Sequence, residues 1–161
     1  MKRAFPWILP LLAAGLAAGA CSKQSPTASA TTSATHAHHP PHGGTPVVLG
    51  GEAYHLEFVR DAIVGKLSAY VLDGEMEEFI RLTAPSLELV VIISGARLTL
   101  TLHAVANPAT GEKIGDTSLF EVDAEWLKGT DNFDAVITGI DIRGTHFGPV
   151  AFNFPKGSDK D

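Results

Sequence analysis

The chain has very little cysteine and few aromatic residues. Of its 161 residues, one is cysteine, two are tryptophan and two are tyrosine. A single thiol excludes an intramolecular disulfide framework and zinc sites built from four cysteines. Basic residues are also in the minority, with 12 Lys and Arg against 18 Asp and Glu, for a net charge of −6. Because an acidic chain is poorly suited to hold phosphates by charge, we expect no nucleic-acid partner.

The common signatures of enzymes are missing as well. The sequence contains no serine in a nucleophile-elbow pattern, no glycine-rich phosphate loop and no His-Glu-x-x-His pair. Carboxylates are numerous, but the sequence marks no two of them as a general acid–base pair. We therefore expect a protein without enzymatic activity.

The longest apolar run stands at the start of the chain. Residues 1–3 carry two positive charges, residues 4–20 are rich in Leu, Ala and Gly, and three small residues lead directly to Cys21. This is the layout of a secretory signal peptide. Its end resembles the lipobox of bacterial lipoproteins, which implies cleavage after residue 20 and acylation of Cys21. An ordinary signal peptide and a membrane-spanning anchor are the alternatives, but the run is short for a span and is interrupted by Pro6 and Pro10.

Lipidation of Cys21 predicts the cellular localisation of the protein. Cleavage leaves 141 of the 161 residues and removes Lys2 and Arg3, so ten basic residues remain against 18 acidic ones and the net charge becomes −8. No second apolar stretch is long enough to span a bilayer, so the lipid itself is expected to hold the protein on the membrane. Ser22 after the lipidated residue favours the periplasmic face of the outer membrane. We expect a lipid-anchored protein of the cell envelope.

Composition divides the remaining chain into three parts. Residues 21–44 comprise the lipidated cysteine, a Ser-, Thr- and Ala-rich stretch and a His-rich segment. The Ser-, Thr- and Ala-rich stretch cannot bury a core and is predicted to be a flexible tether. Residues 45–155 are predicted to form one folded domain, and residues 156–161 a polar tail.

Short β-type runs alternate with turn residues throughout the predicted domain. The strongest hairpin signal is the pair 86–93 and 97–105, joined by Ser94-Gly95, with leucines on the inner face. A helical turn is predicted between Asp123 as its cap and Gly129 as its end. The other strands are predicted at 46–49, 54–60, 66–72, 120–122, 133–142 and 150–154, with 79–82 as a continuation. About eight short strands with almost no helix predict an all-β fold, an antiparallel β-sandwich of immunoglobulin-like or similar type.

Histidines are concentrated just before this domain. Four of the seven in the chain lie within seven residues, at His36, His38, His39 and His42. Imidazole is a common ligand of zinc, copper and nickel, and a flexible cluster lets several rings converge on one ion. Since no further thiolate is available, the tract favours a weak, labile site for divalent copper, zinc or nickel. A His-rich spacer that binds no metal is the alternative.

Two histidines within the domain are secondary candidates for metal ligands. Alternation along residues 54–60 places His55 and Glu57 on the outer face of their strand, and His103 on the outer face of another. If the two strands are neighbours, these three side chains approach one another as ligands. Otherwise they are expected to be polar surface. His146 is assigned to a turn, and the acidic run 73–78 to a solvated turn.

Several short motifs suggest a relationship to other exported proteins. They are the Pro-His-Gly-Gly turn of residues 41–44, "YHLE" at 54–57, "YVLDG" at 70–74, "SLFE" at 118–121 and "ITGIDIRG" at 137–144. In these motifs residues 41–154 resemble a group of uncharacterised exported bacterial proteins. Similar His-Gly-Gly openings occur near modules associated with heavy-metal efflux, so the resemblance implies metal handling, but it implies no catalytic residue.

Together these features predict a lipid-anchored envelope protein that binds a divalent transition metal through residues 36–42. It would buffer the ion or transfer it to an envelope partner such as a metal-efflux protein. The alternative is a structural or protein-interaction lipoprotein of the envelope, in which the histidines have no role.

Overall fold

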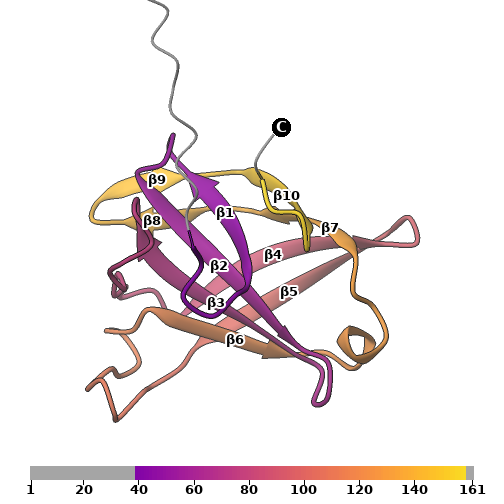
Figure 1. Ribbon diagram of the computed structural model, residues 1–161, viewed down its shortest axis with the longest axis horizontal. Coiled ribbons are helices and arrows are strands. Elements are labelled where there is room, and N and C mark those ends of the chain that lie inside the picture. The colour runs from indigo at the N-terminus through magenta and orange to yellow at the C-terminus, as the bar shows by residue number, and fades with distance from the viewer. Residues whose placement is uncertain (1–38, 159–161) are drawn as a thin grey trace, which may run out of the picture. The chain divides into compact units, whose positions relative to one another are not determined.

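Ten strands and one 3-10 turn make up residues 39–158, the part of the chain described by a computed structural model (Figure 1). The elements are β1 (Thr45–Leu49), β2 (Tyr54–Asp61), β3 (Lys66–Asp73), β4 (Ser86–Ile93), β5 (Ala96–Ala104), β6 (Leu119–Asp123), η1 (Glu125–Lys128), β7 (Phe133–Ile137), β8 (Ile140–Ile142), β9 (Thr145–Phe147) and β10 (Val150–Phe154). The prediction of an all-β fold with one short helical turn is confirmed.

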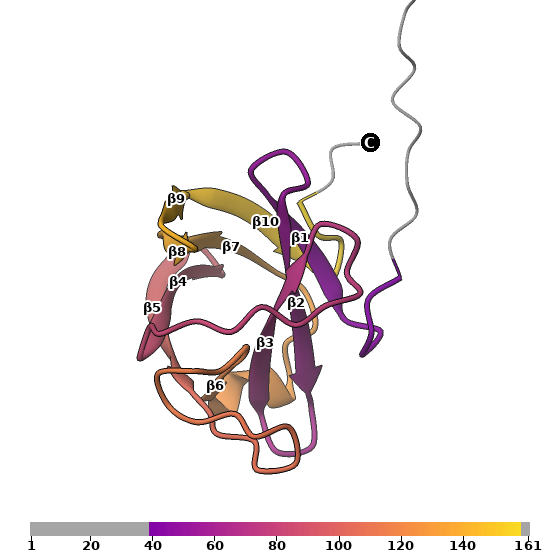
Figure 2. The same cartoon turned by 90° about the vertical axis from the view of Figure 1, so that its left-hand side faces the viewer.

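Eight of these strands form one antiparallel sheet that curls into a nearly closed barrel, as Figure 2 shows from the side. Their order is β1-β2-β3-β6-β5-β4-β7-β10, while β8 and β9 pair only with each other. The predicted two-sheet sandwich does not form. A sandwich needs two sheets with separate edges, whereas here β3 hydrogen-bonds to β6 and β4 to β7. Through these two pairings all eight strands belong to one continuous sheet, instead of to two separate sheets that face each other.

The barrel is filled by its own side chains. Phe58 of β2 stacks on Phe152 of β10, with ring centroids 4.7 Å apart, so side chains from the second strand and the last strand of the sheet meet in the interior. A cavity beside Phe58, Leu87 and Leu102 measures only about 10 Å³, which is no larger than the space that one water needs. This part of the interior therefore contains no room for a ligand.

The gap between the edge strands β1 and β10 is closed by the residues that follow β10. The backbone N–H of Val48 donates to Ser158 Oγ at 2.8 Å, and the hydroxyl of Thr45 donates to the carbonyl of Pro155 at 3.3 Å. These contacts give edge groups of β1 a partner, so the barrel ends on a covered edge.

The hairpin of β4 and β5 forms as predicted. Ile93 pairs with Ala96, which leaves Ser94 and Gly95 as a two-residue loop with φ values of 49° and 82°. Two positive φ values in succession define a type I′ turn, the form that matches the twist of hairpins. One detail differs: Leu98, predicted to face inward, is exposed.

Three local predictions were wrong in detail. Asp123 does not cap the helical turn, because it is the last residue of β6 and Ala124 takes the cap position without a side-chain hydrogen bond. Residues 133–142 form two strands, since β8 leaves the barrel to pair with β9. Residues 79–82 form no strand and make only isolated bridges, from Phe79 to Leu72 and from Leu82 to Thr117.

Candidate functional site

A buried carboxylate on the outer side of β2 holds the last histidine of the tract. The side chain of Glu57 is completely buried. Its Oε1 accepts hydrogen bonds from the backbone N–H groups of His42 and Gly44, each at 2.8 Å, and its Oε2 lies 2.9 Å from Nδ1 of His42. Both oxygens of Glu57 are therefore engaged by residues 42–44.

The glycines beside His42 allow the chain to lie this close to β2. The N–H of Gly43 donates to the carbonyl of Pro40 at 3.0 Å, which closes a turn, and Gly43 has a φ of 66°. A Cβ on Gly44 would lie 2.6 Å from the carbonyl oxygen of Phe58, so this position has no space for a side chain. The predicted turn is confirmed, and the second glycine serves close approach rather than positive φ.

Two aromatic rings contact the imidazole of His42. Its ring stacks on Tyr70 of β3 with centroids 3.8 Å apart, and Phe79 lies tilted at 5.8 Å. Burial, followed by the negative charges of Glu121 and Glu57, raises the pKa of the Tyr70 phenol. The phenol is therefore neutral at physiological pH and acts as a flat, uncharged support.

A second buried carboxylate, Glu112, organises the loop between β5 and β6. Its Oε1 accepts hydrogen bonds from the N–H and the hydroxyl of Ser118, at 2.9 and 2.7 Å, and its Oε2 accepts one from Thr110 at 2.7 Å. Burial alone would raise the pKa of Glu112, but these hydrogen bonds and the nearby charge of Arg81 outweigh burial and lower it. No motif or spacing in the sequence marks Glu112 in advance.

A cavity of about 170 Å³ lies between the two carboxylate clusters. It is lined by His42, Tyr70, Phe79, Asn107, Thr110, Glu112, Ser118 and Leu119. His42 therefore borders a polar and aromatic hollow, with its side chain 36% exposed.

The fold does not bring the two candidate histidines of the domain, His55 and His103, together. β3 and β6 lie between β2, which carries His55, and β5, which carries His103. His103 is exposed, as predicted for an outer face. His55 and Glu57 are buried instead, and Nδ1 of His55 lies 3.3 Å from the carbonyl oxygen of Asp73. Burial on both sides of β2 was not expected from alternation alone, because it depends on chain segments that pack over the outside of the barrel.

The rest of the tract is only partly described. Cys21, His36 and His38 lie outside the described residues, and His39 is exposed. Within residues 39–158 no group of three or more His, Cys, Asp or Glu side chains is arranged to hold a metal ion. Among the described residues, His42 therefore belongs to no such group.

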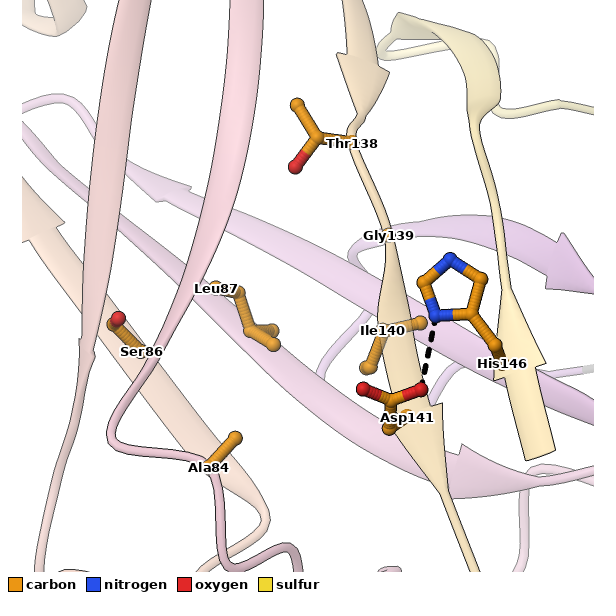
Figure 3. Close-up of a pocket in the computed structure, with 8 residues that line it drawn as sticks. All are labelled: Ala84, Ser86, Leu87, Thr138, Gly139, Ile140, Asp141 and His146. Atoms are coloured by element: carbon orange, nitrogen blue, oxygen red, sulfur yellow. Dashed lines mark hydrogen bonds and ion pairs between the residues drawn. The ribbon is translucent and has the colours of Figure 1, made fainter. Parts of the chain in front are cut away.

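His146 lies in strand β9 rather than in a turn. Its Nδ1 is 2.9 Å from Asp141 Oδ1, at the edge of a cavity of about 300 Å³ that Ser86 also lines (Figure 3). These are the residue types of a hydrolytic triad, but Figure 3 shows Ser86 on the far side of the cavity from His146. A Cβ on Gly139 would lie 2.9 Å from Nε2 of His146, so this nitrogen faces the backbone just before β8. The arrangement lacks the serine–histidine contact that such chemistry needs.

The chain matches no protein-family model, no curated protein and no solved structure. Among residues 39–158, no helix combines the length and the apolar character needed to cross a bilayer.

Proposed function

We propose that this protein is a lipid-anchored envelope protein that captures divalent copper, zinc or nickel through the histidines of residues 36–42. The observation that carries the proposal is the position of His42. It is the last histidine of the tract, it is fixed on the barrel through Glu57, and its Nε2 makes no hydrogen bond to any described residue. One ligand is thus rigid, while the others come from chain that precedes the barrel.

This combination favours a weak and exchangeable site. Neutral imidazoles suit divalent ions of intermediate softness, and a site with only one fixed ligand gains little from preorganisation. Such a site is suited to buffering an ion or transferring it to an envelope partner such as an efflux protein. The lipid on Cys21 would keep it at the membrane, on the periplasmic face of the outer membrane.

Metal titration of the full chain, purified in detergent without a histidine-affinity step, tests the proposal. Zinc(II) and copper(II) are titrated into the wild-type protein and into a variant with alanine at all four tract histidines. We expect the variant to lose the binding. The matched control replaces His103 of β5 and His146 of β9, two exposed histidines outside the tract, and is expected to bind like the wild type. Equal stoichiometry and affinity in wild type and tract variant would exclude the tract from metal binding.

An interaction lipoprotein is the second candidate. It is favoured by Ile63 and Val64, which stand next to each other in the turn between β2 and β3 with 88% and 55% of their surface exposed. Contiguous exposed apolar surface, rather than a single exposed side chain, marks contact sites. Co-purification of an envelope protein in the presence of a chelator, lost on replacing both residues with serine, would support this function.

A further inference from the structure

We propose that Glu57 is the positioning residue of the metal site: it fixes the imidazole proton of His42 on Nδ1 and so presents Nε2 to the ion. The inference rests on the function proposed above. It adds to that function a specific ligand atom and a residue that lies outside the histidine tract.

The hydrogen bonds of Glu57 determine where the proton of His42 lies. An ionised carboxylate only accepts hydrogen bonds. Oε1 is occupied by two backbone N–H groups, and Oε2 lies 2.9 Å from Nδ1 of His42. The ring must therefore donate from Nδ1. In the neutral imidazole this leaves the lone pair on Nε2, the form of histidine that binds a metal ion.

The surroundings of His42 also limit how the ring turns. Its backbone N–H is held by Glu57, and its ring is stacked on Tyr70 at 3.8 Å with planes 14° apart. Metal-ligating histidines commonly donate their second N–H to a carboxylate, which fixes orientation and makes the ligand more basic. Here that partner is in place before an ion binds, so less ordering is needed on binding.

The competing explanation is that Glu57 only holds residues 42–44 on the barrel. Replacing Glu57 with glutamine separates the two roles. The amide oxygen of glutamine still accepts hydrogen bonds from the backbone N–H groups of His42 and Gly44. Its NH₂ group, however, donates to Nδ1, which moves the ring proton to Nε2. Glu57→Gln therefore keeps the turn and reverses the tautomer.

Zinc(II) titration of the full chain tests the role of Glu57. We compare wild type, Glu57→Gln, His42→Ala and the double variant. Loss of such a carboxylate partner typically weakens metal binding by roughly 10- to 100-fold, and we expect Glu57→Gln to fall in this range. The double variant should bind no more weakly than His42→Ala alone. Glu121→Gln is the matched control, because Glu121 is a largely buried carboxylate that accepts hydrogen bonds from Lys66 and Ser68 rather than from a histidine, and it does not line the cavity that His42 borders. It should bind zinc like the wild type.

A measurement on the tautomer accompanies the titration. In ¹⁵N NMR spectra of the metal-free protein, the His42 proton should lie on Nδ1 in the wild type and on Nε2 in Glu57→Gln. Addition of zinc should shift the Nε2 resonance of the wild type. A purely structural role of Glu57 predicts no tautomer change.

Each outcome decides between the two proposals. If Glu57→Gln binds zinc like the wild type while His42→Ala binds more weakly, the positioning role is overturned and the function stands. If the wild type binds no better than the chain without the four tract histidines, both are overturned. Should Glu57→Gln fail to fold, the wild-type spectra still decide, because a proton on Nε2 in the metal-free protein contradicts the inference.

Discussion

Tyr70 of β3 lies directly opposite Glu57 of β2, and both side chains contact His42. One strand supplies the carboxylate that binds the imidazole, and its neighbour supplies the ring that supports it. Two paired strands of the barrel therefore supply the side chains that hold His42 in place.

The stack on Tyr70 predicts how substitutions there affect zinc binding. Tyr70→Leu removes the ring, whereas Tyr70→Phe keeps it and removes only the hydroxyl. Aromatic stacking contributes about 0.5–1.5 kcal/mol beyond buried area. We expect Tyr70→Leu to weaken zinc binding by an amount in this range and Tyr70→Phe to bind like the wild type, as measured by calorimetric titration. An equal loss in both variants would assign the effect to the hydroxyl and contradict a role of the stack.

The lowered pKa of Glu112 predicts a pH-dependent contribution to stability. A carboxyl whose pKa is lower in the folded state stabilises the fold at pH values above its unfolded pKa. That contribution is lost as the pH falls through the folded pKa. Hydrogen bonds to a charged group contribute about 1.5–3 kcal/mol. We expect Glu112→Gln to destabilise the protein by up to this amount at pH 7 and by less at pH 3.

Thermal unfolding at the two pH values measures this difference. Glu125→Gln is the control, because the side chain of Glu125 is 85% exposed and pairs with Lys128 within η1. Its effect should stay within about 0.5 kcal/mol. A destabilisation by Glu112→Gln that is the same at pH 3 and pH 7 would show that the ionised form is not what stabilises the loop.

The features that sequence predicted well are local in the chain. The β4–β5 hairpin follows from two alternating runs and a Ser94-Gly95 loop, all within twenty residues. The Gly43 turn likewise follows from glycine's tolerance of positive φ. Both features depend only on residues that are close together in the sequence, so no knowledge of distant contacts is needed to predict them.

The burial of His55 and Glu57 was not predictable in the same way. Alternation correctly assigns both to the outer side of β2, but it does not reveal that residues 42–44 lie over Glu57 or that His55 approaches the carbonyl oxygen of Asp73. The nearest signal is Gly44, a second glycine where one would suffice for a turn. It indicates a close approach to some other backbone, and only the fold identifies that backbone as β2.

The strand order and Glu112 depended on long-range contacts. The pairings β3–β6 and β4–β7 join strands distant in sequence, and they decide between one curled sheet and two facing sheets. Both arrangements bury the same alternating positions, so the pattern of side chains does not separate them. Glu112 stands in a polar loop without any regular spacing, and its burial arises only from how that loop folds back on Ser118.

Two substitutions in the loop of the β4–β5 hairpin are expected to change the stability of the protein in opposite directions. Gly95 has a φ of 82°, and a Cβ added there would have no other atom within 4 Å, so alanine at this position meets only backbone strain. A non-glycine residue in this region costs about 1–2 kcal/mol, and Gly95→Ala should destabilise by about that amount. Ser94→Asn creates the Asn-Gly pair that type I′ turns prefer and should stabilise the protein.

Urea unfolding measures both substitutions. The control is Gly129→Ala, because Gly129 also has open space around it but a negative φ of −111°. Gly129→Ala should not show the decrease in the free energy of unfolding that we expect for Gly95→Ala. If Gly129→Ala and Gly95→Ala prove equally costly, the left-handed conformation of the loop is not the cause.

Lipidation of Cys21, which lies outside the described residues, is the prediction on which localisation depends. Wild-type protein expressed in a bacterial host should incorporate labelled palmitate, remain with the membrane fraction and have the mass of residues 21–161 plus acyl chains. Cys21→Ser removes the only thiol in the chain. It should take up no label and leave the membrane fraction, since no other apolar stretch after residue 20 is long enough to hold it there. His103→Ala, a surface change in the barrel, should be labelled like the wild type. A free thiol at Cys21 in protein extracted from membranes would exclude the lipid anchor and, with it, the assignment to the periplasmic face of the outer membrane.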